Sequence, residues 1–180
     1  MANAFLCAME ENLERENKLP EFYKRYVDDT LAILRDIPIA TKFPSTLNNY
    51  HPALNFTMEL ADDNKLPFLG MTICKSGPRL TTMVCRKPTN TCLLLHFQSH
   101  VDQRSKTSLL KTMLNRAYRL SSSWDLFKKE CEHLKEMFQN LKYPERLIDS
   151  TIANFVDSVI SQEPNSVTTT TPEKIGRAHV

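Results

Sequence analysis

The sequence contains very little glycine and no long apolar run. Three glycines among 180 residues form no motif of the kind that cradles nucleotide phosphates, which argues against that class of binding site. The apolar runs are only a few residues long, whereas a membrane-spanning helix needs roughly 20 apolar residues. We therefore expect an intracellular protein that has no membrane partner.

Cysteine is present without the spacing that stabilises small folds. The five cysteines are odd in number and include no Cys-x-x-Cys pair, so neither a disulfide framework nor a zinc ribbon is indicated. Cys92, His96 and His100 are four residues apart and would share one face of a helix as metal ligands. The same segment is equally compatible with a strand, which would not gather them, and it offers no fourth ligand. We expect no metal site there.

Acidic residues are nearly absent from the middle of the chain. Residues 1–64 carry 6 basic and 11 acidic side chains, residues 65–119 carry 10 and 1, and residues 120–180 carry 7 and 9. An ordinary protein surface mixes the two signs, so one acid among the eleven charges of the middle segment is unusual. This concentration of positive charge favours a polyanionic partner.

Two acidic residues stand at the centre of an apolar run between Phe22 and Leu34. Segments rich in aromatic and β-branched residues flank Asp28-Asp29, a pattern that predicts a strand, a tight turn and a second strand. The turn would hold both carboxylates at a hairpin tip. Because Asp is common in turns, a surface hairpin without chemistry is the alternative. Asp62-Asp63, in a polar loop without such flanks, is interpreted as an ordinary turn.

The rest of the first half predicts one helix, a loop-rich segment and three strands. Residues 2–13 favour a helix that is buried early and solvated late, because its first half is apolar on all sides. Three prolines between 36 and 52 allow at most one short helix, near residues 45–50. Antiparallel strands are then expected at residues 54–60, 67–73 and 80–86, the last after a turn at Lys75–Pro78.

Beyond Val101 the apolar period becomes helical. Three amphipathic helices are predicted: one with its apolar stripe from Leu109 to Tyr118, one after Ser123, and one from Tyr143-Pro144 onward. Together they would form a small bundle of helix-turn-helix type. Residues 162–173 are expected to be a disordered tail. Residues 174–180 resemble a translated sequencing adapter and are set aside as an artefact.

The string Tyr26-Val27-Asp28-Asp29 between two hydrophobic strands resembles the catalytic palm hairpin of reverse transcriptases. Leu66–Gly70 resembles the primer-grip hairpin of that family, and residues 86–91, 95–100 and 140–144 resemble segments of Penelope-like retroelements. The resemblance runs from about residue 1 to 160. It implies an α+β fold, with a partial antiparallel polymerase palm in residues 1–88 and a three-helix thumb, or helix-turn-helix-like region, in residues 89–161.

This resemblance implies an RNA-directed DNA polymerase that works with two magnesium ions, an RNA template, a DNA primer and deoxynucleoside triphosphates. Asp28 would be the main magnesium ligand and Asp29 the subsidiary one, while Tyr26 would lie near the primer end or the incoming nucleotide. Residues Phe68, Leu69 and Gly70 would hold the primer strand. Lys65 would be either a proton donor to the pyrophosphate or an ordinary surface lysine.

The cations implied to contact nucleic acid are Arg86, Lys87, Arg104, Lys106, Lys111, Arg116 and Arg119. In the resembling family the fingers, half of the palm and another catalytic aspartate precede the equivalent of Met1. We therefore expect a fragment of a nuclear enzyme that is inactive alone. The alternative is a non-catalytic basic nucleic-acid-binding module. A helix-turn-helix regulator is a third possibility, but it rests on residues 102–160 and leaves the acidic hairpin unexplained.

Overall fold

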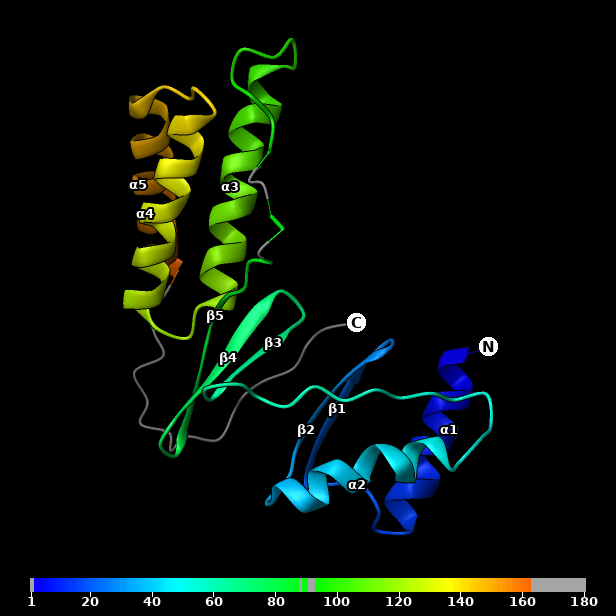
Figure 1. Ribbon diagram of the computed structural model, residues 1–180. Coiled ribbons are helices and arrows are strands. Elements are labelled where there is room, and N and C mark those ends of the chain that lie inside the picture. The colour runs from blue at the N-terminus through cyan, green and yellow to red at the C-terminus, as the bar shows by residue number, and fades with distance from the viewer. Residues whose placement is uncertain (1, 88, 91–92, 163–180) are drawn as a thin grey trace. The chain divides into compact units, whose positions relative to one another are not determined.

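The computed structural model describes residues 2–87, 89–90 and 93–162. Over these ranges the chain is α+β, with five helices and five strands in two small antiparallel sheets (Figure 1). It divides into two compact units, Met1–Thr89 with Leu120–Ser123, and Asn90–Arg119 with Trp124–Val180. The predicted α+β class is confirmed. The adapter-like residues and all but the first residue of the predicted tail lie outside the described residues.

The first unit has a small core between two helices. Helix α1 (Ala2–Arg15) contributes Met9 and Leu13, and helix α2 (Ile37–Asn48) contributes Leu47. The prediction that α1 is buried early and solvated late was wrong, because Phe5 is 41% exposed whereas Met9 and Leu13 are buried. Only one stripe of α1 packs on the core, and its fully buried residues lie in the second half of the helix.

Helix α2 is longer than its prolines predicted. It runs for 12 residues, with Pro38 in the first turn and Pro44 in the interior. In the first turn a backbone N–H has no partner within the helix, so Pro38 costs no hydrogen bond. Pro44 removes one bond, yet Ala40 and Leu47 on either side of it are buried. The predicted limit to a short helix at 45–50 was therefore wrong, since packing outweighs one missing bond.

Strands β1 (Phe22–Tyr26) and β2 (Asp29–Ile33) form the predicted hairpin. Tyr26 pairs with Asp29, so Val27 and Asp28 are the two residues of the turn. The tip thus lies one residue earlier than the acidic pair suggested, and Asp29 is the first residue of a strand. The ring of Tyr23 packs edge-on against Phe43 of α2, with 6.1 Å between centroids.

The segment 54–60 is not a strand, which corrects the prediction made from its apolar content. The side-chain amide of Asn48 satisfies both backbone groups of Phe56: the Phe56 N–H donates to Asn48 Oδ1 at 2.6 Å and Asn48 Nδ2 donates to the Phe56 carbonyl at 3.1 Å. Because these backbone bonds are already made, Phe56 packs on the core of the first unit without joining a sheet.

The second sheet consists of β3 (Lys65–Phe68), β4 (Met71–Ser76) and β5 (Arg79–Val84) in sequential antiparallel order. The predicted strand 67–73 was wrong as a single element. Leu69 and Gly70 have φ of 46° and 76°, so a two-residue turn with left-handed backbone splits it into a hairpin. The turn predicted at Lys75–Pro78 is confirmed, with Gly77 at φ 60° between β4 and β5.

The second unit is the predicted helix-turn-helix-like bundle. Helices α3 (Gln103–Leu120), α4 (Trp124–Asn140) and α5 (Glu145–Gln162) run side by side (Figure 1). Tyr118, Phe127 and Phe155, one from each helix, form edge-to-face and tilted contacts with centroids 5.6–6.2 Å apart. The three helices therefore share one core, as their apolar stripes predicted.

Candidate functional site

The turn that carries Asp28 has an unusual backbone. Val27 has φ of 57°, a left-handed conformation that is rare for any residue with a Cβ and is a genuine outlier for a β-branched one. Val27 is 65% exposed, so burial of its side chain does not offset this strain. Strained residues persist only where their surroundings hold them, and such positions cluster at functional sites.

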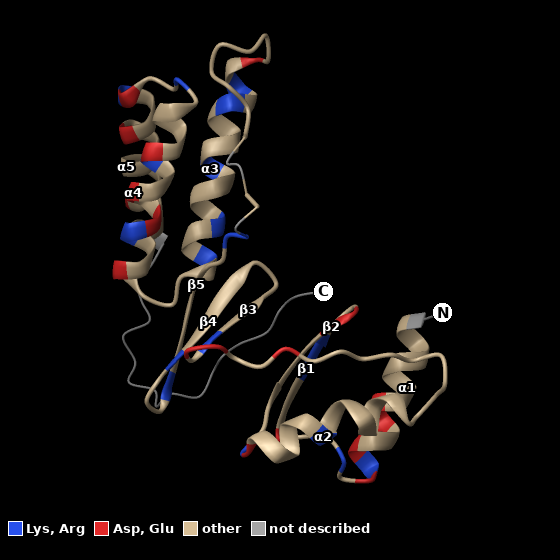
Figure 2. Cartoon of the chain, viewed as in Figure 1, with Lys and Arg blue, Asp and Glu red and all other residues tan. Residues whose placement is uncertain are grey.

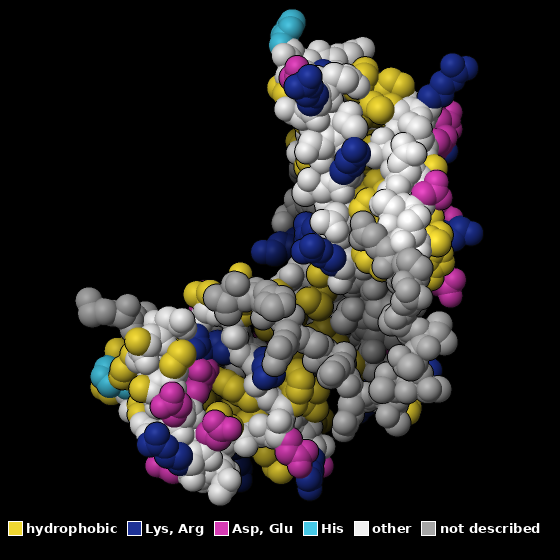
Figure 3. All heavy atoms as spheres, turned by 180° about the vertical axis from the view of Figure 1, so that it is seen from behind, with side chains coloured by type: hydrophobic (Ala, Val, Ile, Leu, Met, Phe, Trp, Pro, Cys, Tyr) yellow, Lys and Arg dark blue, Asp and Glu magenta, His cyan; other side chains and the backbone are white. Residues whose placement is uncertain are grey.

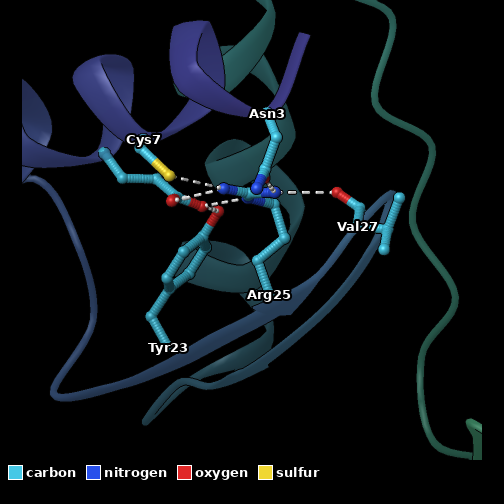
Figure 4. Close-up of polar contacts among 6 residues, drawn as sticks. Asn3, Cys7, Tyr23, Arg25 and Val27 are labelled. Carbon is cyan, nitrogen blue, oxygen red and sulfur yellow. Dashed lines mark hydrogen bonds and ion pairs between the residues drawn. The ribbon is translucent and has the colours of Figure 1, made fainter. Parts of the chain in front are cut away.

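Arg25 holds this turn in place through a network that reaches α1. Its Nη1 donates to the Val27 carbonyl at 2.9 Å and to Asn3 Oδ1 at 2.8 Å, while Nε and Nη2 donate to the two carboxylate oxygens of Glu10 at 2.5 and 2.9 Å. Figure 4 shows Asn3 and Cys7 reaching from α1 toward the guanidinium. The side chains of Arg25 and Glu10 are only 7% and 19% exposed, so the pair fixes the hairpin on the helix.

Tyr23 completes the network from the same strand. Its hydroxyl donates to Glu10 Oε1 at 3.0 Å. Burial first, and then this hydrogen bond to a carboxylate, raise the pKa of Tyr23 from 10.0 to about 12. The bidentate hydrogen bond to Glu10 likewise raises the pKa of the Arg25 guanidinium. Glu10 therefore serves both as the acceptor and as the fixed negative charge of the network.

Asp28 lies in the exposed turn of the β1–β2 hairpin, and Asp29 is the first residue of β2 next to it. Asp28 and Asp29 are exposed, and Tyr26 beside them is 59% exposed. In the described part of the chain neither carboxylate forms an ion pair, and no group of three or more His, Cys, Asp or Glu side chains could hold a metal ion. The tip therefore provides two adjacent carboxylates, which are oxygen ligands for a metal ion.

The residues predicted to hold the primer form the turn of the second hairpin. Leu69 and Gly70 are its two central residues, and Phe68 precedes them as the partner of Met71. Cys85 N–H donates to the Gly70 carbonyl at 3.0 Å, which ties the turn to the end of β5. Lys65 is exposed and lies 3.7 Å from the Asp63 carboxylate, as a surface lysine would.

Four of the predicted cations share the exposed surface of α3. Arg104, Lys111, Arg116 and Arg119 are exposed, and the helix itself contains no acid. Blue positions recur along α3 in Figure 2, whereas α4 carries both colours. Among the described residues none of the four forms an ion pair. The positive charge of this helix is therefore available to a partner.

The other predicted cations are placed differently. Lys106 is only 6% exposed, its ammonium donates to the Ser99 carbonyl at 2.8 Å, and it lies 5.2 Å from the centroid of the Phe97 ring. Lys106 thus anchors the segment before α3, which corrects its grouping with the nucleic-acid-binding residues. Arg86 and Lys87 belong to the first compact unit, where Lys87 is exposed and Arg86 is partly buried.

The helical unit is similar to a known family. Residues 93–153 match a family model described as an animal helix-turn-helix domain. This span contains α3, the turn at 121–123, α4 and the first half of α5. No curated protein and no solved structure matches the chain. None of the described helices is long and apolar enough to cross a membrane.

Sequence reasoning missed the residues that support the hairpin. Glu10 and Arg25 are 15 positions apart on different elements, and no spacing rule connects them. The available signal was weak: Lys24 and Arg25 are adjacent cations on β1, and alternation places only one of them on the face that packs against the helix, where a cation needs an acidic partner. The strain at Val27 has a clearer signal, since a two-residue turn requires a positive φ at one of its central positions.

The strain at Val27 leads to a prediction about stability. Val27→Gly should raise the free energy of unfolding by about 0.5–1 kcal/mol, because glycine adopts a positive φ without the steric penalty and little buried surface is lost. Urea unfolding followed by circular dichroism measures the change. Val27→Ala is the matched control, since it retains a Cβ and should give no gain. Equal stability of the Gly and Ala variants would show that the turn is unstrained.

A second prediction concerns the titration of Tyr23. Below pH 10 the tyrosine is protonated in both states, whereas between pH 10 and about 12 only the unfolded chain loses the proton, so stability should fall across this window. Phenolate absorbance should contain a late component that disappears in Tyr23→Phe. In Glu10→Gln this component should move toward pH 10, because the carboxylate charge is gone. A single common titration of all tyrosines would contradict the network.

Proposed function

We propose that this chain is part of an RNA-directed DNA polymerase of the reverse transcriptase type, similar to those of Penelope-like retroelements. In this proposal the β1–β2 hairpin carries the carboxylates that bind magnesium. The β3–β4 turn contacts the primer strand, and the helical unit binds the RNA–DNA duplex through α3. The observation that carries the proposal is the strained Tyr-Val-Asp-Asp turn, which Arg25 and Glu10 hold in place.

The geometry of the tip supports a metal-binding role. A turn is a costly place for a β-branched residue, yet the network on α1 stabilises that conformation. A nucleotidyl-transfer site needs its carboxylates on rigid supports. The bidentate Arg25–Glu10 pair and the Tyr23 hydroxyl provide such a support directly beneath the turn.

The two carboxylates at the tip can supply part of the coordination shell of a magnesium ion. Magnesium in phosphate-transfer sites is held by one or two carboxylates, with waters and substrate phosphates as further ligands. Asp28 and Asp29 would hold one ion in this way. When bound, the metal would stabilise negative charge on the reacting phosphate oxygens. Tyr26 from the same hairpin would position the primer end or the incoming nucleotide.

The exposed surface of α3 supports the binding of a nucleic acid. Four exposed cations on an acid-free helix attract the phosphate backbone, which carries no base identity, so affinity should depend on salt more than on sequence. The match of residues 93–153 to an animal helix-turn-helix domain supports the same role. This part of the proposal stands whether or not the hairpin is catalytic.

The second candidate function is a non-catalytic nucleic-acid-binding module. The observation that favours it is that the family match covers the helical unit alone and does not include the acidic hairpin. The two candidates make the same prediction for α3. They differ in whether the tip at Asp28 binds a divalent ion, and an experiment on that tip separates them.

The metal-binding prediction uses Mn²⁺ as a paramagnetic substitute for Mg²⁺. Low concentrations of Mn²⁺ should broaden the NMR amide signals of residues 27–30 first, and excess Mg²⁺ should restore them. Asp28→Asn should remove the effect. The chain offers a matched control in its other acidic pair, since Asp63 already lies beside Lys65. Asp62→Asn should leave the broadening unchanged, and equal broadening at both pairs would argue for the second candidate.

The nucleic-acid prediction concerns salt dependence. If Lys111, Arg116 and Arg119 each neutralise a separate phosphate, replacing all three with Gln should flatten the slope of log affinity against log salt by about two to three units for an RNA–DNA duplex, because each neutralised phosphate contributes roughly 0.7–0.9. If Lys111 shares its phosphate with another cation, the slope should flatten by only about 1.4–1.8. Fluorescence anisotropy at several salt concentrations measures this slope.

The matched control removes the same charge from other exposed sites of the helical unit. Lys128, Lys129 and Lys142 lie outside α3, and their replacement with Gln should change the slope by less than one unit. If both triple variants flatten the slope equally, binding follows net charge, and α3 has no special role.

A further inference from the structure

The exposed side of α3 contains a hollow, to which the match to the helix-turn-helix family assigns no role. It has a volume of about 350 Å³, is open to solvent, and is lined by Gln103, Arg104, Thr107, Ser108 and Lys111. We call these five residues the α3 hollow. All five belong to one helix, so the hollow is formed by long side chains that stand on either side of short ones.

The lining is rich in hydrogen-bond donors and contains no carboxylate. Arg104 and Lys111 are seven residues apart, which places their backbones about 10 Å apart along the helix. The short side chains of Thr107 and Ser108 lie between them in the sequence. The Thr107 hydroxyl donates its one hydrogen to the Gln103 carbonyl at 3.1 Å, so the other four side chains supply the donors of the lining, and Ser108 among them is exposed. A ligand rich in acceptor oxygens would complement this lining.

The one nearby acid is engaged in the start of the helix. Asp102 Oδ1 accepts the Arg104 backbone N–H at 2.6 Å, and its carbonyl accepts the N–H groups of Ser105 and Lys106. Its carboxylate therefore serves as a helix cap and is absent from the lining of the hollow. In the view from behind, Lys and Arg side chains stand clear of the surface of the helical unit at several places (Figure 3).

We propose that the α3 hollow is a phosphate-binding site that takes one backbone phosphate of a nucleic acid between Arg104 and Lys111. The inference rests on the proposed nucleic-acid binding and specifies where the contact is made. It also makes the first helix of the pair the one that faces the nucleic acid, whereas the second helix does so in the usual helix-turn-helix arrangement.

The charge on α4 agrees with this assignment. Its acidic residues are Asp125, Glu130, Glu132 and Glu136. Its Lys135 bonds Glu145 and Asp149 of α5 at 3.2 and 2.9 Å, so that cation is already neutralised within the bundle. A surface of mixed sign repels a phosphate backbone more than the acid-free surface of α3 does.

The test compares single and double variants in titrations of a labelled RNA–DNA duplex at several salt concentrations. If Arg104 and Lys111 share one phosphate, Arg104→Gln or Lys111→Gln alone should weaken binding by about tenfold with little change in slope, because the other cation still neutralises the phosphate. The double variant should flatten the slope by about 0.9, since one phosphate contact is then lost. Two independent contacts would instead give about 0.9 for each single variant and about 1.8 for the double one.

Two variants without a change of charge probe the shape of the site. Arg104→Lys keeps the charge but loses the planar pair of donors, and Ser108→Ala removes a hydroxyl at an exposed helical position where alanine does not disturb folding. Each should weaken duplex binding several-fold at an unchanged slope if a phosphate is held in the hollow. Unchanged affinity for both would indicate a diffuse cationic surface and overturn the site.

Inorganic phosphate distinguishes the source of the ligand. In the NMR spectrum it should shift the amide signals of residues 103–111 at high concentration, and the duplex should shift the same signals at far lower concentration. Shifts with inorganic phosphate alone would make the hollow a free-phosphate site and overturn the proposal. Duplex binding that is lost in Arg116→Gln/Arg119→Gln but retained in the Arg104/Lys111 double variant would overturn the hollow while the proposed function stands. No duplex binding by the wild-type chain would overturn both.

Discussion

The bidentate pair between Arg25 and Glu10 is the interaction on which the hairpin depends. Both side chains are largely removed from water, and removal of one partner of a buried pair generally costs about 3–5 kcal/mol because an uncompensated charge remains. The same guanidinium donates to the Val27 carbonyl, so the pair also fixes the turn. A two-stranded hairpin is marginally stable by itself in water, and here the ion pair and the Tyr23–Phe43 contact attach it to both helices of its unit.

A different feature characterises the helical unit: positive charge alone lies on α3, whereas charges of both signs lie on α4 and α5. Its core is built from the stripes that all three helices present, with Leu110, Leu114, Phe138 and Ile148 fully buried. Outside that core, α3 carries only positive charge, whereas the cation Lys135 of α4 is neutralised by acids of α5. Packing does not require this segregation, because exposed charges of either sign would solvate equally well. The nucleic-acid binding that we propose for α3 would account for it.

The cations of α3, which the sequence presented as one group, differ in how deeply they are buried. Lys106 lies between Arg104 and Lys111 in the sequence, yet it points toward the core side of α3, where its ammonium meets a carbonyl and an aromatic ring. The Phe97 N–H donates to the Leu141 carbonyl at 2.9 Å, so the segment before α3 is bound both to α3 and to the end of α4. The cation therefore contributes to the fold, and its neighbours on the outer surface remain available to bind a partner.

The sequence by itself determined the elements that depend on local pattern. Apolar flanks around Tyr26–Asp29 specified the hairpin, helical periodicity specified α3, α4 and α5, and composition placed the positive charge between Lys65 and Arg119. Tertiary structure decided the remainder, including the contact of Glu10 with Arg25, the capture of Phe56 by Asn48 and the burial of Lys106. The physical reason is that the sequence pattern is local, whereas these contacts join residues that only the fold brings together. Periodicity reports which face of an element is apolar, but which polar groups must pair is fixed only when packing removes them from water.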